Sequence, residues 1–123
     1  MRTIEAAAIT EAVARLSINS NYYLAEDVFE ALKSSIEKEE SPLGKEVLEQ
    51  IVENACIAKN EDRAICQDTG MAIVFIEIGQ DVHIVGGGLE DAVNAGVAKG
   101  YIEGYLRKSV VAEPLFNRKN TAL

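Results

Sequence analysis

The sequence predicts an α+β fold in which N-terminal helices precede a β-hairpin, a long helix with a stripe of glycines, and an irregular basic tail. Three observations indicate this class. Apolar residues recur at helical spacing in the first third of the chain and again after residue 89, residues 71–85 are rich in β-branched residues, and residues after 111 have no period. The length of 123 residues suits one compact unit, so we expect a single domain over residues 1–123.

Three helices are expected in the first half of the chain. Apolar residues at i, i+4 and i+7 predict helices over about residues 3–17 and 22–38, with a polar turn between them. Ser41 followed by Pro42 is typical of a helix start, with an N-cap and a proline at the first helical position. This pair predicts a third helix from about residue 42 to 58, followed by a polar loop.

A β-hairpin is expected next. Residues Met71 to Ile78 are almost all apolar, so a strand there would need cover on both faces. Gly79 to Asp81 has the residue types of a turn, and Val82 to Val85 favours a second strand.

The last predicted helix runs from Leu89 to about Val110. It has a small residue at every fourth position, namely Ala92, Gly96, Gly100 and Gly104. Each glycine inside a helix costs about 1 kcal/mol relative to alanine, so the row indicates that another backbone approaches closely. We interpret the row as a site of tight helix packing.

Charge and composition exclude several classes of function. The net charge of −8 repels a phosphate backbone, so a nucleic-acid partner is not expected. The longest apolar run, residues 71–76, is far shorter than the ~20 residues of a membrane helix, and the N-terminus lacks the apolar core of a signal peptide. These features predict a soluble cytoplasmic protein without a membrane partner, with Cys56 and Cys66 as reduced thiols. His83, within a predicted strand, is expected to be structural or solvent-facing.

Residues 66–70 place a thiol, an amide, a carboxylate and a hydroxyl consecutively on a loop before an apolar strand, in the order Cys-Gln-Asp-Thr-Gly. Binding groups concentrate on loops that rigid elements hold in place. From the residues alone, two interpretations stay open. Asp68 is presented to a cavity, or Asp68 and Thr69 only cap the turn.

Several separated segments resemble the class I, iron-sulfur fumarate hydratase alpha subunit, and the L-tartrate dehydratase alpha subunit is similar in the same places. In chain order these segments are Asn21–Leu24, Cys66–Gly70, Gly86–Gly88 and Arg107–Thr121. The resemblance covers essentially the whole chain.

The resemblance implies roles for four residues. Cys66 would bind one iron of a 4Fe-4S cluster, Gln67 and Asp68 would lie at the substrate, with Asp68 in proton transfer, and Arg107 would pair with a substrate carboxylate. These residue types suit the chemistry, because thiolates bind iron-sulfur clusters, carboxylates move protons and guanidinium groups bind carboxylates bidentately. The charge of +3 over residues 107–123 independently favours a dianion near Arg107.

The implied reaction is the reversible hydration of fumarate to (S)-malate, a step of the tricarboxylic acid cycle. In that mechanism three cysteines hold the cluster, and its open iron acts as a Lewis acid. Dehydration of L-tartrate is the alternative reaction.

The chain departs from the family pattern in length. Alpha subunits of the family are more than twice as long and bring two further cluster cysteines, whereas Cys56 matches no ligand position. We therefore expect an N-terminal portion of the alpha subunit that is inactive alone, with the remainder of that subunit and a beta subunit as partners in an oligomer. A noncatalytic assembly or interaction module derived from the subunit is the competing hypothesis.

Overall fold

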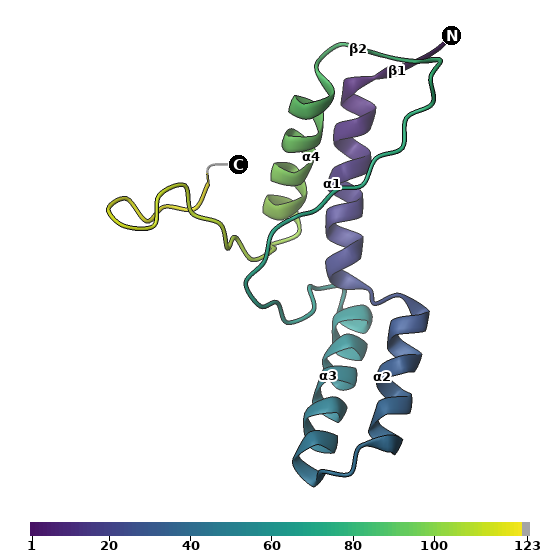
Figure 1. Ribbon diagram of the computed structural model, residues 1–123, viewed down its shortest axis with the longest axis vertical. Helices are drawn as coiled ribbons and strands as arrows, with labels where there is room; N and C mark the ends of the chain where they lie inside the picture. The colour runs from purple at the N-terminus through teal and green to yellow at the C-terminus, as the bar shows by residue number, and fades with distance from the viewer. Residues whose placement is uncertain (122–123) are drawn as a thin grey trace. The chain divides into compact units, whose positions relative to one another are not determined.

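The computed structural model describes residues 1–121 and confirms the α+β class (Figure 1). The elements in chain order are β1 (Arg2–Glu5), α1 (Ala6–Tyr22), α2 (Glu26–Lys38), α3 (Pro42–Glu61), β2 (Val82–Val85) and α4 (Leu89–Glu103). Among the described residues, no helix is both long enough and apolar enough to cross a membrane.

The chain divides into two compact units. Unit 1 contains residues 1–18 and the chain from residue 68 onward, and unit 2 contains residues 19–67. The single domain expected over residues 1–123 stays a prediction.

The three N-terminal helices are confirmed, but several boundaries differ from the prediction. Helix α1 begins at Ala6 instead of near residue 3, because residues 2–5 form strand β1, and α2 begins at Glu26 while α3 extends to Glu61. Helix α1 continues to Tyr22 instead of ending near residue 17. The hydroxyl of Ser17 donates to the carbonyl of Val13 (2.9 Å), one turn earlier in the same helix, so this side chain bonds within the helix and does not end it. The expected turn at 17–23 is therefore mostly helical. The helix start at Ser41 is confirmed, since the Gly44 N–H donates to the Ser41 hydroxyl (3.3 Å) and Pro42 is the first helical residue.

The predicted β-hairpin is wrong. Strand β2 pairs in parallel with β1, in a register that places Arg2 opposite Val82 and Glu5 opposite Val85. The turn at Gly79 forms, since the Val82 N–H donates to the Gly79 carbonyl (3.1 Å). The carbonyl of Asp81, however, accepts a hydrogen bond from the Arg2 N–H (2.9 Å), so the chain after the turn pairs with the N-terminal strand. The partner of β2 is thus the N-terminal strand, and residues 71–78 are in no strand.

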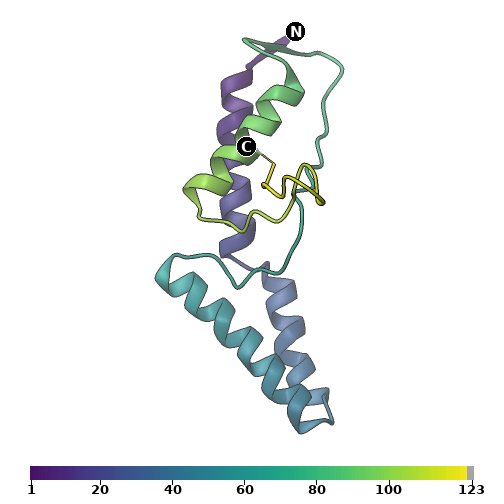
Figure 2. The same ribbon diagram turned by 90° about the vertical axis from the view of Figure 1, so that its left-hand side faces the viewer.

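The glycines after β2 allow a tight turn into α4. Gly86 has a φ of 79°, a conformation that costs energy for residues with a Cβ, and a Cβ there would lie 2.9 Å from the Glu5 carboxylate. The turn places α4 beside α1, and the two helices run in the same direction, as Figures 1 and 2 show.

The glycine row of α4 packs against α1, as predicted. A Cβ at Gly96 would lie 2.7 Å from the carbonyl oxygen of Thr10, and one at Gly100 would lie 2.7 Å from that of Ala14. The Thr10 hydroxyl donates to the Ala92 carbonyl (2.9 Å), which adds a direct hydrogen bond between the helices. The two helix backbones therefore lie closer together than side chains with a Cβ would allow.

Helix α4 ends at Glu103, earlier than the predicted end near residue 110. Gly104 is its C-cap, and Tyr105 has a left-handed φ of 52° that stops the helix. The Leu106 N–H then donates to the Tyr101 carbonyl (3.0 Å), and the Leu106 side chain is buried.

The tail is irregular after residue 111, as predicted, and also over residues 107–110, which were expected to be helical; it folds back on itself. Val111 and Asn120 form an isolated antiparallel bridge, and the side-chain amide of Asn120 donates to the carbonyl of Lys108 (2.9 Å). At the tip, the Glu113 carboxylate accepts the backbone N–H groups of Leu115 (2.8 Å), Phe116 (2.5 Å) and Asn117 (2.9 Å). These hydrogen bonds lower the pKa of the Glu113 carboxyl group, and the one from Asn117 has the largest effect.

The first prediction concerns the helix contact. Gly100→Ala should lower the free energy of unfolding of the chain by about 1–3 kcal/mol, because overpacking against Ala14 and Ser17 outweighs the ~1 kcal/mol gain in helix propensity. Urea unfolding measures the change. The matched control is Gly44→Ala in α3, whose new Cβ meets only the movable side chain of Glu39. Equal or greater stability of Gly100→Ala would contradict the close contact.

The second prediction concerns the turn at Glu113. A lowered pKa means that the carboxylate stabilises the folded turn at neutral pH, and that this contribution is lost as the pH falls through the folded-state pKa, below the ordinary value of 4.5. The amide chemical shifts of residues 115–117 should therefore titrate with a midpoint below 4.5. Glu113→Gln should abolish this titration, and a midpoint at or above 4.5 would refute the turn geometry.

Candidate functional site

Two asparagines of unit 2 hold the start of the loop that contains Cys66. The backbone carbonyl of Asn21, in the last turn of α1, accepts the Ile65 N–H (2.8 Å), and its side-chain oxygen accepts the Gln67 amide (2.6 Å). The side-chain oxygen of Asn54, on α3, accepts the Cys66 N–H (2.9 Å). The backbone on both sides of the cysteine is thus fixed to two helices.

Asp68 and Thr69 make a local turn. The Thr69 N–H donates to one carboxylate oxygen of Asp68 (2.7 Å), and both residues are exposed. This is the contact expected if Asp68 caps the turn, which is one of the two interpretations that the sequence allowed. A carboxylate has a second oxygen, so the capping contact and a role in proton transfer are compatible.

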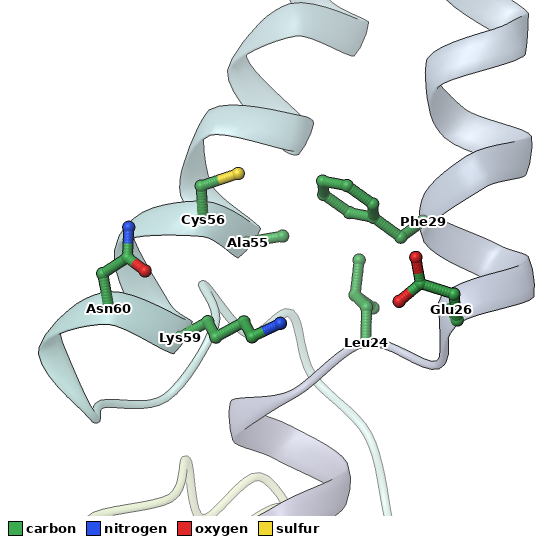
Figure 3. A pocket seen from close by; sticks show the side chains of 7 residues that line it. All are labelled: Leu24, Glu26, Phe29, Ala55, Cys56, Lys59 and Asn60. Atoms are coloured by element: carbon green, nitrogen blue, oxygen red, sulfur yellow. The ribbon is translucent and has the colours of Figure 1, made fainter.

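The two cysteines lie in different surroundings within unit 2. Cys66 is exposed on the loop, and Cys56 is partly buried on α3. Figure 3 shows the Cys56 sulfur pointing toward Phe29 of α2. A pocket of about 260 Å³ surrounds it, lined by Leu24, Glu26, Phe29, Ala55, Cys56, Lys59 and Asn60. Cys56 is therefore placed as a packing residue between two helices.

Cys66 suits one ligand position of an iron-sulfur cluster. Its thiol is exposed, and its backbone is held by hydrogen bonds on either side, so it can meet a group that approaches from outside this loop. Within residues 1–121, no three His, Cys, Asp or Glu side chains come together to hold a metal ion. The described residues thus offer one exposed thiol for a cluster, without a complete set of ligands around it.

The four predicted site residues fall in both units. Cys66 and Gln67 belong to unit 2, while Asp68 and Arg107 belong to unit 1. Arg107 is exposed and directly follows the buried Leu106, at the base of the folded tail. The burial of Leu106 therefore anchors the backbone next to the guanidinium.

The two asparagines that hold the cysteine loop were not predicted from the sequence. Asn21 was noted only as part of a resembling segment, although an asparagine near a helix end is a common backbone-binding residue and could have indicated this role. Asn54 stands inside a regular helical pattern, where no local signal distinguishes it from a solvent-facing residue.

Comparison with known proteins finds one matching family. Residues 10–123 match the family model described as fumarate hydratase (Fumerase). This match includes the cysteine loop, the glycine row and the tail.

Relatives with similar sequences are named as alpha subunits of L(+)-tartrate dehydratase. The putative L(+)-tartrate dehydratase subunit alpha of Methanocaldococcus jannaschii is 40% identical over 75 residues, which are 61% of this chain and 26% of that protein. The L(+)-tartrate dehydratase subunits alpha of Escherichia coli O157:H7 and strain K12 are 28% and 27% identical over 113 residues, which are 92% of this chain and 36% of each relative. The chain thus spans about a quarter to a third of the length of these relatives.

The family match confirms the resemblance of the separated sequence segments to the fumarate hydratase alpha subunit. It extends over nearly the whole chain and not over a single motif. The chain therefore belongs to the fumarate hydratase (Fumerase) family of hydro-lyases.

Proposed function

We propose that the chain is an N-terminal portion of the alpha subunit of an iron-sulfur hydro-lyase that, when complete, hydrates fumarate reversibly to (S)-malate. The observation that carries this proposal is the family match over residues 10–123, which includes Cys66, Gln67, Asp68 and Arg107. The tethered cysteine loop supports it, because a cluster ligand and substrate-binding groups need a fixed backbone.

Cys66 is the proposed ligand to one iron of a 4Fe-4S cluster, and the remaining ligands would come from outside this chain. When bound, the cluster would supply an open iron that acts as a Lewis acid toward substrate oxygens. The hydrogen bond from the Cys66 N–H to Asn54 would keep the thiolate in place.

Gln67, Asp68 and Arg107 are proposed to act on the substrate. The hydrogen bond between the Gln67 amide and Asn21 orients that side chain, so it can present a defined hydrogen-bonding face to the substrate. Asp68 would hold or accept the proton at the carbon that gains or loses hydrogen, and Arg107 would bind a substrate carboxylate.

The proposed partners follow from the relatives, which are named as alpha subunits. We propose that the remainder of an alpha subunit and a beta subunit complete the enzyme, in a cytoplasmic oligomer that serves the tricarboxylic acid cycle.

Dehydration of L-tartrate is the second candidate reaction. The names of the relatives favour it, since each relative described above is an L(+)-tartrate dehydratase subunit alpha. L-Tartrate and malate are both C4 hydroxy acids with two carboxylates, so the proposed roles of Asp68 and Arg107 serve either substrate.

The test of function is a comparison of both substrates with the complete enzyme, assembled and assayed without oxygen. Fumarate hydration is followed by the loss of fumarate absorption and by malate formation, and tartrate dehydration by oxaloacetate formation. A higher kcat/KM for fumarate supports the first candidate, and a higher value for L-tartrate selects the second. The absence of both activities from a cluster-loaded enzyme would refute the proposed function.

The third prediction separates the two cysteines. In the complete enzyme, Cys66→Ser should lose the cluster, because a serine hydroxyl is a poor substitute for a thiolate ligand, whereas Cys56→Ser should keep it. Iron content and visible absorption measure the difference. Equal iron loss in the two variants would show that Cys66 is not a specific ligand.

The fourth prediction concerns Asp68. Asp68→Asn retains a side-chain oxygen that can accept the Thr69 N–H, so the turn should persist, but the amide cannot accept a proton at neutral pH. The variant should therefore lower kcat by about 100-fold or more with a modest change in KM. Iron content is measured in parallel, so that cluster loss is not mistaken for lost catalysis. If Asp68→Asn retained the wild-type kcat, Asp68 would have no role in proton transfer and would only cap the turn.

The fifth prediction concerns Arg107. Arg107→Ala should weaken binding by about 2–5 kcal/mol if the pair with the substrate carboxylate is buried, which appears mainly as a raised KM. Lys108→Ala is the matched control, because it removes a neighbouring exposed charge. An equal rise in KM for both variants would indicate general charge attraction and would contradict a specific pair with Arg107.

A further inference from the structure

The apolar segment Gly70–Ile78 of unit 1 is extended but unpaired. Among the described residues, none of its backbone N–H or C=O groups makes a hydrogen bond with another backbone group. A buried backbone group without a partner costs free energy comparable to a lost hydrogen bond, so apolar segments of this kind normally lie within sheets.

The side chains of this segment alternate between two faces. Met71, Ile73 and Phe75 are 71%, 70% and 93% exposed, although each is a large hydrophobic residue. Val74, Ile76 and Ile78 are less exposed, at 39%, 48% and 47%. The segment therefore has the two-residue period of a β-strand, with one apolar face open to solvent.

Val74, Ile76 and Ile78 line a groove of about 680 Å³ between the segment, the two strands and α1, and Phe75 and Glu77 also border it. Figure 1 shows the segment running beside α1 toward β2. The groove is lined mainly by apolar residues, among them Ile9, Ala12 and Leu16 of α1 and Ile84 of β2, with Arg2 and Glu77 as its charged residues. An apolar groove beside an unpaired strand is suited to an apolar strand of another segment.

We propose that residues 71–78 form a central strand that pairs on both edges with strands from the remaining portion of the alpha subunit, whose apolar side chains cover Met71, Ile73 and Phe75 and fill the groove. The inference rests on the proposed identity of the chain as a portion of that subunit.

Two observations favour this occupant over a second copy of the chain. The relatives have the required additional length, since 113 aligned residues are only 36% of one of them. A twofold dimer that pairs this segment with its copy would satisfy one edge of each strand and leave the other edge unpaired. Apolar residues on both faces are typical of strands inside a sheet, with neighbours on each side.

Residue-resolved amide hydrogen exchange tests the proposal, in the chain of residues 1–123 alone and in the complete alpha subunit. Consecutive N–H groups of a strand point to opposite edges, so the pattern of protection reports how many edges are paired. We expect amides 72–77 to exchange at nearly unprotected rates in the chain alone, and at least about 100-fold more slowly at consecutive residues in the complete subunit.

A side-chain variant checks that the protection comes from docking. Phe75→Ser should reduce this protection at least about 10-fold in the complete subunit, while Tyr105→Ser, which removes another aromatic side chain that is 90% exposed in unit 1, should not. Equal effects of the two variants would contradict the assigned surface.

Three further outcomes would overturn the proposal. Unchanged exchange in the complete subunit would show that the segment is not a docking strand. Protection at alternate residues alone would show a single paired edge. Protection in the chain alone that rises with concentration to the level of the complete subunit would identify a second copy as the occupant. Protection in the alpha subunit, with no fumarate or tartrate turnover by the complete, cluster-loaded enzyme, would uphold the docking strand and refute only the proposed function.

Discussion

The close approach of α1 and α4 is the contact on which unit 1 depends. Strand β1 runs directly into α1, and β2 leads through three glycines into α4, so helices held together at Gly96 and Gly100 also bring the two strands side by side. The parallel ladder is short, and few large side chains are buried, which leaves the backbone contact and the Thr10 hydrogen bond as the main constraints. The glycines are needed because any side chain would separate the helices.

Arg107 of the candidate site adjoins this framework through the buried Leu106, whereas Cys66 depends on a separate set of contacts. Asn21 and Asn54 hold the loop by hydrogen bonds to backbone and amide groups. Because the chain contributes one suitable thiol, the cluster site would form only when further segments supply the other ligands. The proposed docking of residues 71–78 would have the same origin, since it too would need contacts from outside the chain.

The sequence predicted the features that depend on local spacing. Helical periods located α1 to α4, and the glycine row indicated the helix contact, because a repeated energetic cost needs a compensating neighbour. The hairpin prediction was wrong because adjacent residues were assumed to pair, whereas β2 pairs with a strand about 80 residues away in the sequence. Asn54 was missed for a similar reason, since its contact with Cys66 is not local. The site residues themselves came from the resemblance, and their roles stay predictions.

The most direct test of the account is anaerobic iron-sulfur reconstitution of residues 1–123, alone and together with the remaining alpha and beta portions. The account predicts no stable cluster and no malate formation from the chain alone, because only Cys66 is proposed as a ligand, and a stable cluster with turnover once the other portions are present. Iron content, visible absorption and fumarate hydration measure these outcomes. A stoichiometric cluster with steady malate formation by the chain alone would contradict the account.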